Sequence, residues 1–190
     1  VCGQEKDGDY FDVLNNAAKD IPAGSDGVLF LPYLTGGTND VKEATGCFLN
    51  MTLDTDQATL WHAVLEAIGY DYMEITDLYR GAGVDMSRIT ITEGGSRSEI
   101  WNQMKSDMLG SEVITLKNAG GAVVTDCIVG AYALGHITDM KAALTESLEI
   151  KKLYYTNAEN HDFYAKQYAL QKKLVKQDMK EAFHTLKALH

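Results

Sequence analysis

Apolar residues recur at helical spacing in several parts of the chain and predict most of its helices. The longest predicted helix covers Gln57 to Tyr79. We expect its apolar stripe to face the core, and that stripe consists of Leu60, Val64, Ala67, Ile68, Tyr72, Ile75 and Leu78. The segment from Gly121 to Leu134 is apolar nearly all round, so we predict that it is buried. Other helices are predicted at Tyr10 to Ala18, Ile100 to Met108, Asp139 to Leu148 and Glu159 to Leu189.

Short apolar or β-branched runs predict the strands. They lie at Val28 to Leu31, Gly46 to Met51, Ile89 to Thr92 and Val113 to Leu116. Strand and helix alternate from Ile89 onward, which predicts an α/β fold with a mixed, mostly parallel sheet and flanking helices. Residues 1–190 contain no internal repeat or linker, so we expect a single domain.

Charge and composition exclude several classes of function. The net charge of −10, from 27 acidic and 17 basic side chains, argues against nucleic-acid binding, which needs a dense basic face. No apolar run reaches the roughly 18 residues needed to span a membrane. Three cysteines without metal-ligand spacing favour a reduced, cytoplasmic protein, and we expect the five scattered histidines at the surface or its rim. The first residues contain neither Met nor a signal peptide, and we expect the chain to begin within something larger.

The stretch from Ile91 to Trp101 is the best candidate for chemistry. A predicted strand ends there, Gly94 and Gly95 follow, and a helix begins at once. Glycines let a ligand approach the main chain closely, and a helix N-terminus offers unpaired amides to a phosphate. A plainer interpretation stays open, because Ser96 and Glu99 match a capping box that only starts a helix.

Three blocks in order and spacing resemble the C-terminal domain of the FGGY carbohydrate kinases, with the wording nearest to xylulose kinases. They are Gly27 to Gly36; Gly46 to Met51 followed by Leu60 to Glu66; and Gly94 to Ser98 with Trp101, Asp107 and Gly110. The resemblance implies an actin-like ATPase (ribonuclease H-like) fold, in which two halves close over ATP and a sugar. It also implies that Gly94, Gly95, Ser96 and Glu99 line the ATP site. Glu66 is expected to support the domain core rather than the chemistry.

The same resemblance implies that this chain is only the nucleotide-binding half of the enzyme. The family's first phosphate loop and its catalytic base belong to the N-terminal sugar-binding half. We therefore assign no catalytic residue and no metal ligand here. Mg²⁺, a sugar or polyol and the absent N-terminal half are the expected partners, and a homodimer is a further possibility. This fragment is predicted to be inactive by itself.

Several positions depart from the family pattern. Asn50 and Glu93 stand where the family commonly has glycine, and Thr125 and Asp126 replace small residues near the expected nucleotide cleft. A carboxylate about 4 Å from a phosphate costs roughly 1 kcal/mol in water and about 4 kcal/mol at an effective dielectric of 20. Glu93 must therefore point away, be bridged by a cation, or weaken binding. A catalytically degenerate nucleotide- or partner-binding module remains the alternative to an active kinase.

Overall fold

The computed structural model describes residues 10–37, 41–117 and 121–188. Their helices are α1 Tyr10–Ala18, α2 Gln57–Gly81, α3 Glu99–Leu109, α4 Gly121–Ala133, α5 Met140–Ser147, α6 Ala158–Lys173 and α7 Lys180–Lys187. Their strands are β1 Leu29–Leu31, β2 Cys47–Leu49, β3 Arg88–Ile91, β4 Glu112–Leu116 and β5 Ile150–Tyr154. Short 3₁₀ turns occupy Ser25–Gly27 and Gly94–Ser96, and a π-helical segment, Leu174–Asp178, joins α6 to α7.

The strands form two small sheets. β1 and β2 pair antiparallel, and the second sheet has the order β3-β4-β5. β3 runs parallel to β4, whereas β5 runs antiparallel to it. The α/β class is confirmed, but among the described strands only the β3–β4 pairing is parallel, so the sheet is less parallel than predicted. β5 was not predicted, because two lysines interrupt its apolar pattern.

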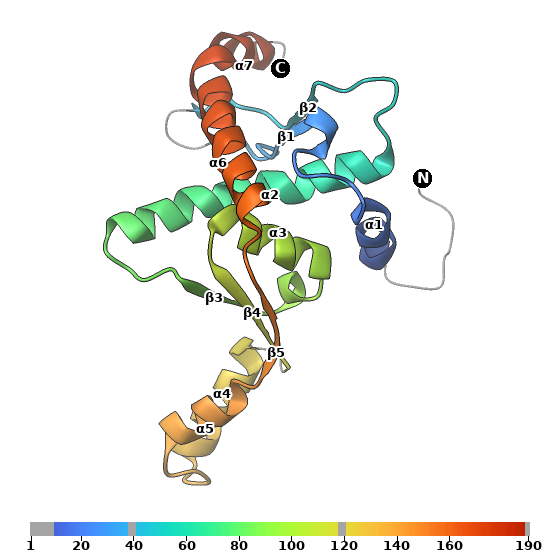
Figure 1. Ribbon diagram of the computed structural model, residues 1–190. Coiled ribbons are helices and arrows are strands. Elements are labelled where there is room, and N and C mark those ends of the chain that lie inside the picture. Colours follow the sequence, from blue (N-terminus) through green and yellow to red (C-terminus); the bar gives the residue numbers. More distant parts are fainter. Residues whose placement is uncertain (1–9, 38–40, 118–120, 189–190) are drawn as a thin grey trace.

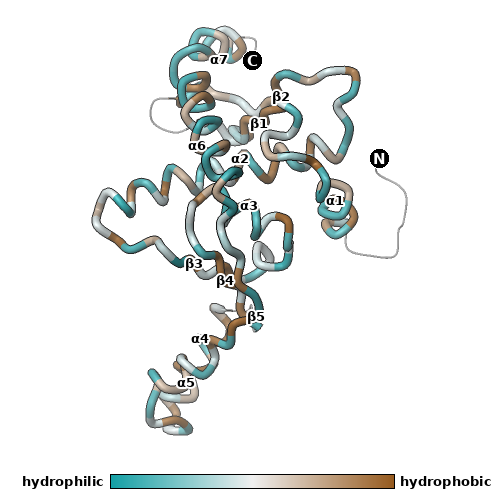
Figure 2. Tube along the Cα trace, in the orientation of Figure 1, coloured by the Kyte–Doolittle hydropathy of each residue, from teal (hydrophilic) through white to brown (hydrophobic). Residues whose placement is uncertain are grey.

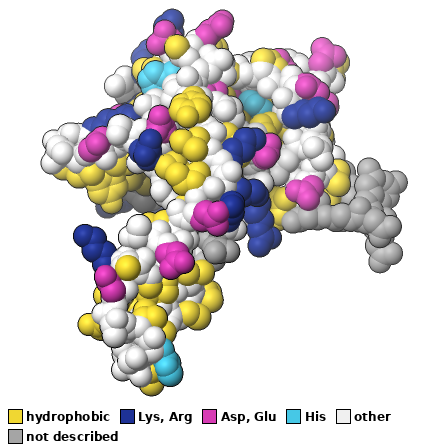
Figure 3. All heavy atoms as spheres, turned by 60° about the horizontal axis from the view of Figure 1, so that its bottom comes forward, with side chains coloured by type: hydrophobic (Ala, Val, Ile, Leu, Met, Phe, Trp, Pro, Cys, Tyr) yellow, Lys and Arg dark blue, Asp and Glu magenta, His cyan; other side chains and the backbone are white. Residues whose placement is uncertain are grey.

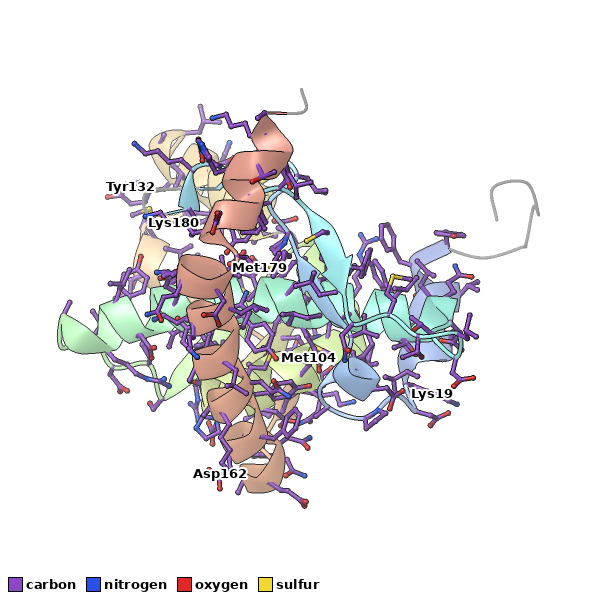
Figure 4. All side chains as sticks on the ribbon, turned by 90° about the horizontal axis from the view of Figure 1, so that it is seen from above. Lys19, Met104, Tyr132, Asp162, Met179 and Lys180 are labelled. Atoms are coloured by element: carbon purple, nitrogen blue, oxygen red, sulfur yellow. The ribbon has the colours of Figure 1, made fainter. Side chains whose placement is uncertain are left out.

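The core lies where α2 crosses α3 and α6 (Figure 1). Met104 of α3 lies in this interior (Figure 4) and is 5% exposed. The buried cluster comprises Leu65, Tyr70, Met73, Met104, Met108, Leu109, Tyr164 and Tyr168. Trp61 and Trp101 pack against it, half-buried. The strand β4 at the centre of the second sheet is hydrophobic at Val113, Ile114 and Leu116 (Figure 2), and its residues from Val113 to Leu116 are buried.

The apolar stripe predicted to face the core along α2 is only partly buried, which corrects that expectation. Ala67 is buried, but Tyr72, Ile75 and Leu78 are exposed. The α2 residues that pack with α3 and α6 are instead Leu65, Tyr70 and Met73, and Ala63 and Ala67 are also buried. The last turns of α2 extend past the sheet (Figure 1), where Ile75 and Leu78 are 48% and 70% exposed, while Tyr72 stacks on Trp101 with ring centroids 6.4 Å apart.

The prediction that the helix from Gly121 to Leu134 is buried is wrong. No residue of α4 or α5 is buried. The two helices pack on each other beyond the end of the second sheet (Figure 1), and hydrophobic side chains gather on this lobe (Figure 3). Nothing else in the described part of the chain covers α4. Its all-round apolar pattern is therefore covered on the side of α5 and left largely exposed elsewhere.

A buried polar network ties the first block to α2 and α6. The Glu66 carboxylate accepts hydrogen bonds from Gly24 N (2.7 Å), Ser25 Oγ (2.7 Å) and Tyr164 OH (2.9 Å). Because Ser25 donates to Glu66, its oxygen accepts from His62 Nδ1, which lies 2.8 Å away. The structural role expected for Glu66 is confirmed. The surface position expected for His62 is wrong, because this residue is 4% exposed.

Candidate functional site

The Gly94–Ser96 turn lies between the end of β3 at Ile91 and the start of α3 at Glu99. Ser98, rather than Ser96, is the N-cap of α3, since its side chain accepts a hydrogen bond from Trp101 N. The capping-box interpretation of Ser96 and Glu99 is therefore wrong. Ser96 is buried, and its hydroxyl donates to Glu93 O at 2.7 Å, which closes the turn on itself.

The two glycines of the turn lie at the surface. Gly94 is exposed and has nothing within 4 Å of the position of a Cβ. Gly95 is half-buried, and a Cβ there would lie 3.6 Å from the Trp101 ring, an ordinary contact. A ligand can thus approach the main chain at Gly94 without obstruction from the described residues.

Two side chains of α3 hold the turn from beneath. Asn102 Nδ2 donates to Ser96 O at 2.8 Å, and Lys105 Nζ donates to Gly95 O at 2.9 Å. These bonds fix the Gly95 and Ser96 carbonyls on the α3 side, while Ser96 N and Arg97 N donate within the turn to Glu93 O and Gly94 O. Neither Asn102 nor Lys105 was predicted as a site residue from the sequence. Polar residues three apart on one side of a predicted helix that packs on the core need a buried hydrogen-bond acceptor, and this spacing is what could have indicated them.

Lys105 is a buried cation at this turn. It is 1% exposed, and among the described residues no carboxylate lies within ion-pair distance of it. Its ammonium lies 3.6 Å from the centre of the Trp101 ring. Burial lowers the pKa of Lys105 to about 8.

Glu93 has a backbone conformation that glycine favours and a side chain that points to α4. Its φ of 58° and ψ of −154° fall in a region that is almost exclusive to glycine. Its carboxylate accepts a hydrogen bond of 3.4 Å from Ala122 N, in the first turn of α4. Gly121 packs on Thr92, where a Cβ would lie 3.4 Å from the threonine methyl carbon. The start of α4 therefore lies beside the turn, and Thr125 and Asp126 are exposed further along the helix, where their place near a nucleotide cleft stays a prediction.

Glu99 lies apart from the other predicted ligands. Its carboxylate pairs with Lys152 Nζ of β5 at 3.0 Å. It lines a hollow of about 580 Å³, together with Lys19, Tyr154 and Tyr164. Lys19 follows α1 (Figure 4). Gly94, Gly95 and Ser96 do not border this hollow, so the structure brings these three together and separates Glu99 from them.

Metal and membrane signatures were also sought in the described ranges. No group of His, Cys, Asp or Glu there is placed to hold a metal ion. Across the same ranges, every helix is too short or too polar to cross a bilayer.

Comparisons with known proteins identify the family. The model of the FGGY family of carbohydrate kinases, C-terminal domain, matches residues 3–134. The chain belongs to this family. A xylulose kinase of Staphylococcus epidermidis is 29% identical over 169 residues, which are 88% of this chain and 34% of that relative. A gluconokinase of Bacillus subtilis is 34% identical over 140 residues, 70% of this chain and 27% of that relative.

The solved structures of FGGY kinases confirm the fold. A xylulose kinase from Rhodospirillum rubrum superposes with a TM-score of 0.75 and 25% identity, covering 92% of this chain and 35% of that one. The predicted actin-like ATPase fold is therefore confirmed for this FGGY chain. The chain spans about a third of the length of the curated relatives it matches.

Proposed function

We propose that this chain supplies the ATP-binding half of a carbohydrate kinase that transfers the γ-phosphoryl group of ATP to a hydroxyl of a small sugar. The observation that carries the proposal is the Gly94–Ser96 turn, whose main chain at Gly94 is open to a ligand and whose Gly95 and Ser96 carbonyls are tied to α3. Amides in this position bind phosphate or ribose oxygens without a Cβ in the way.

The proposed sugar is a pentulose such as xylulose. Similarity to xylulose kinases over 88% of the chain supports this choice, and similarity to gluconokinases makes a sugar acid the competing substrate. The groups that recognise sugar hydroxyls, the catalytic base and the ligands of Mg²⁺ would come from polypeptide outside this chain. Phosphoryl transfer depends on positioning and charge neutralisation from both sides of the phosphates. The fragment alone should therefore bind nucleotide weakly and phosphorylate no sugar. The whole kinase is proposed to act in the cytoplasm.

The test of nucleotide binding uses the 190-residue chain and its Gly94→Val variant. Ligand-observed NMR with MgATP detects binding in the millimolar range. A valine at Gly94 would project into open space, so we expect the fold to be retained and ATP binding to be lost. Gly130→Val is the matched control, because Gly130 also has nothing within 4 Å of a Cβ but lies on α4. Equal ATP signals from the Gly94→Val variant and the wild-type chain would refute the site.

A catalytically degenerate module is the second candidate, and Glu93 favours it. Glu93 places a carboxylate beside the turn, where the family commonly has glycine, and its charge would oppose a phosphate bound close to it. The two candidates differ in turnover by the whole kinase. ADP release with xylulose, gluconate or a polyol supports the enzyme, whereas nucleotide binding without ADP release for any of them supports the module.

A further inference from the structure

We propose that Lys105 is a positioning residue of the nucleotide site: its buried ammonium fixes the Gly94–Ser96 turn and places positive charge directly beneath it. This inference rests on the proposed ATP-binding function. It adds a residue that the family resemblance did not single out, on the inner face of α3.

The contacts of Lys105 all converge on the turn. Its Nζ donates to Gly95 O at 2.9 Å and lies 3.4 Å from Asn102 Oδ1, while Asn102 itself donates to Ser96 O. The Trp101 ring covers the ammonium from 3.6 Å. Lys105 therefore fixes the Gly95 carbonyl inward, and the N–H of the same peptide, Ser96 N, is held within the turn by Glu93 O at 3.1 Å.

The charge of Lys105 has no partner that would explain it as a structural ion pair. The side chain is 1% exposed, and no carboxylate in the described ranges lies within 4.0 Å of its nitrogen. Burying an ammonium without a counter-ion is unfavourable for folding. A methionine of similar shape would fill the same space beside Trp101 without this cost. An anion that arrives at the exposed side of the turn supplies the missing opposite charge.

A role as a reactive amine does not fit the geometry. A nucleophilic lysine needs access for its substrate. The nitrogen of Lys105 instead lies under the turn and is occupied by two oxygen acceptors and an aromatic ring. Its effect must reach the ligand through Gly95 and through its electric field.

The experiment compares thermal stability with nucleotide affinity in the Lys105→Met variant of the 190-residue chain. ATP and adenosine are titrated separately by ligand-observed NMR, and unfolding is followed by circular dichroism. We expect an equal or higher Tm, an ATP affinity at least fivefold weaker, and an adenosine affinity within twofold of wild type. Lys180→Met, at an exposed site on α7, removes the same charge and should change none of these quantities.

Each other outcome has a definite meaning. Unchanged ATP affinity in Lys105→Met overturns the role of Lys105 while leaving the proposed function intact. A fall in Tm with equal losses for ATP and adenosine also overturns it, because the residue would then only hold the fold. A wild-type chain that binds neither ligand refutes the proposed function itself. If Lys105→Met does not fold, Lys105→Gln gives the same comparison, with the expected loss of ATP affinity at least twofold.

Discussion

At the scale of single residues, the two departures from the family's glycines keep the backbone that glycine would adopt. Asn50 has a φ of 59° and Glu93 a φ of 58°. Asn tolerates this region well, and Asn50 is further held by its side-chain hydrogen bond to Gly27 O at 3.0 Å. Glu93 has no such support, since its side-chain contact with Ala122 N measures 3.4 Å. The turn therefore stores strain at Glu93.

Replacing Glu93 by glycine should release this strain. A non-glycine residue in such a conformation costs on the order of 1–3 kcal/mol, so we expect Glu93→Gly to raise the unfolding free energy by about 1 kcal/mol after the loss of the Ala122 contact. Glu93→Gln is the control, because it removes the charge and keeps the strained backbone. Urea unfolding measures both. A Glu93→Gly protein no more stable than Glu93→Gln would contradict the strain.

His62 and Glu66 should give the stability two opposing dependences on pH. Burial lowers the pKa of His62 from 6.5 to about 4, so the unfolded chain binds a proton below pH 6.5 that the folded chain refuses. The contribution of His62 to the unfolding free energy therefore falls by about 3 kcal/mol as the pH drops from above 6.5 to below 4. Burial raises the pKa of Glu66 from 4.5 to about 6, so its contribution is present below pH 4.5 and lost, by about 2 kcal/mol, as the pH rises through 6.

Single substitutions separate the two groups. Lowering the pH from 7 to 4.5 should destabilise His62→Gln by about 2.5 kcal/mol less than it destabilises the wild type, because the variant lacks the group that refuses the proton. Glu66→Gln should shift the opposite way over the same range. Unfolding by urea at pH 7, 5.5 and 4.5 measures both slopes. Parallel pH profiles for wild type and His62→Gln would show that His62 accepts a proton in the folded state.

At the scale of elements, periodicity predicted where helices occur better than which face they bury. The helix at Gln57–Gly81 was predicted nearly to its ends, but Tyr72, Ile75 and Leu78 on its predicted inner face are exposed. The spacing of apolar residues along a helix shows which of them share a face. Whether that face is buried depends on which other elements pack against it. β5 was not predicted because its two exposed lysines interrupt the apolar pattern of a short strand. It pairs with β4, which the local pattern does not show. The glycines of the turn were predicted from the sequence, but the α3 side chains that hold it, Asn102 and Lys105, were not.

The crossing of α2 and α3 depends on a glycine. A Cβ at Gly69 would lie 2.2 Å from Met108 Sδ, and Met108 is 1% exposed. We expect Gly69→Ala to destabilise the protein by about 1–3 kcal/mol through overpacking, although alanine favours helix. Gly81→Ala in the same helix meets nothing within 4 Å and should be neutral or stabilising by up to about 1 kcal/mol. Denaturant unfolding of the two variants and the wild type measures both changes in unfolding free energy.

A second substitution checks the cause of the Gly69 effect. Met108→Ala removes the side chain that a Cβ at Gly69 would strike, so Gly69→Ala should cost less in that background than in wild type. Coupling of this kind is expected for residues in direct contact. Additive effects of the two substitutions would show that the loss at Gly69 does not arise from contact with Met108.

At the scale of the whole molecule, the apolar surface of the α4–α5 lobe is the feature least like an ordinary soluble domain. Its exposed large side chains are Val123, Val129, Tyr132, Leu134, Met140 and Leu148. The prediction that α4 is buried is wrong, although the composition of this helix is that of a covered one. Burial is missing because the elements described here leave that face open, and the matched kinases are about three times longer than this chain.

This surface should make the isolated chain associate with itself. Contiguous exposed apolar patches favour association in water, so we expect the weight-average sedimentation coefficient to rise with concentration. Leu134 and Leu148 are 75% and 56% exposed, and the double variant Leu134→Lys/Leu148→Lys should remove the rise without lowering the Tm. Leu53→Lys is the matched control, since Leu53 is 105% exposed but lies outside the lobe. A wild-type coefficient that stays constant with concentration would mean that α4 and α5 remain soluble without a cover. Association that survives in the double variant would place the contact elsewhere, with the exposed stripe of Tyr72, Ile75 and Leu78 on α2 as the next surface to substitute.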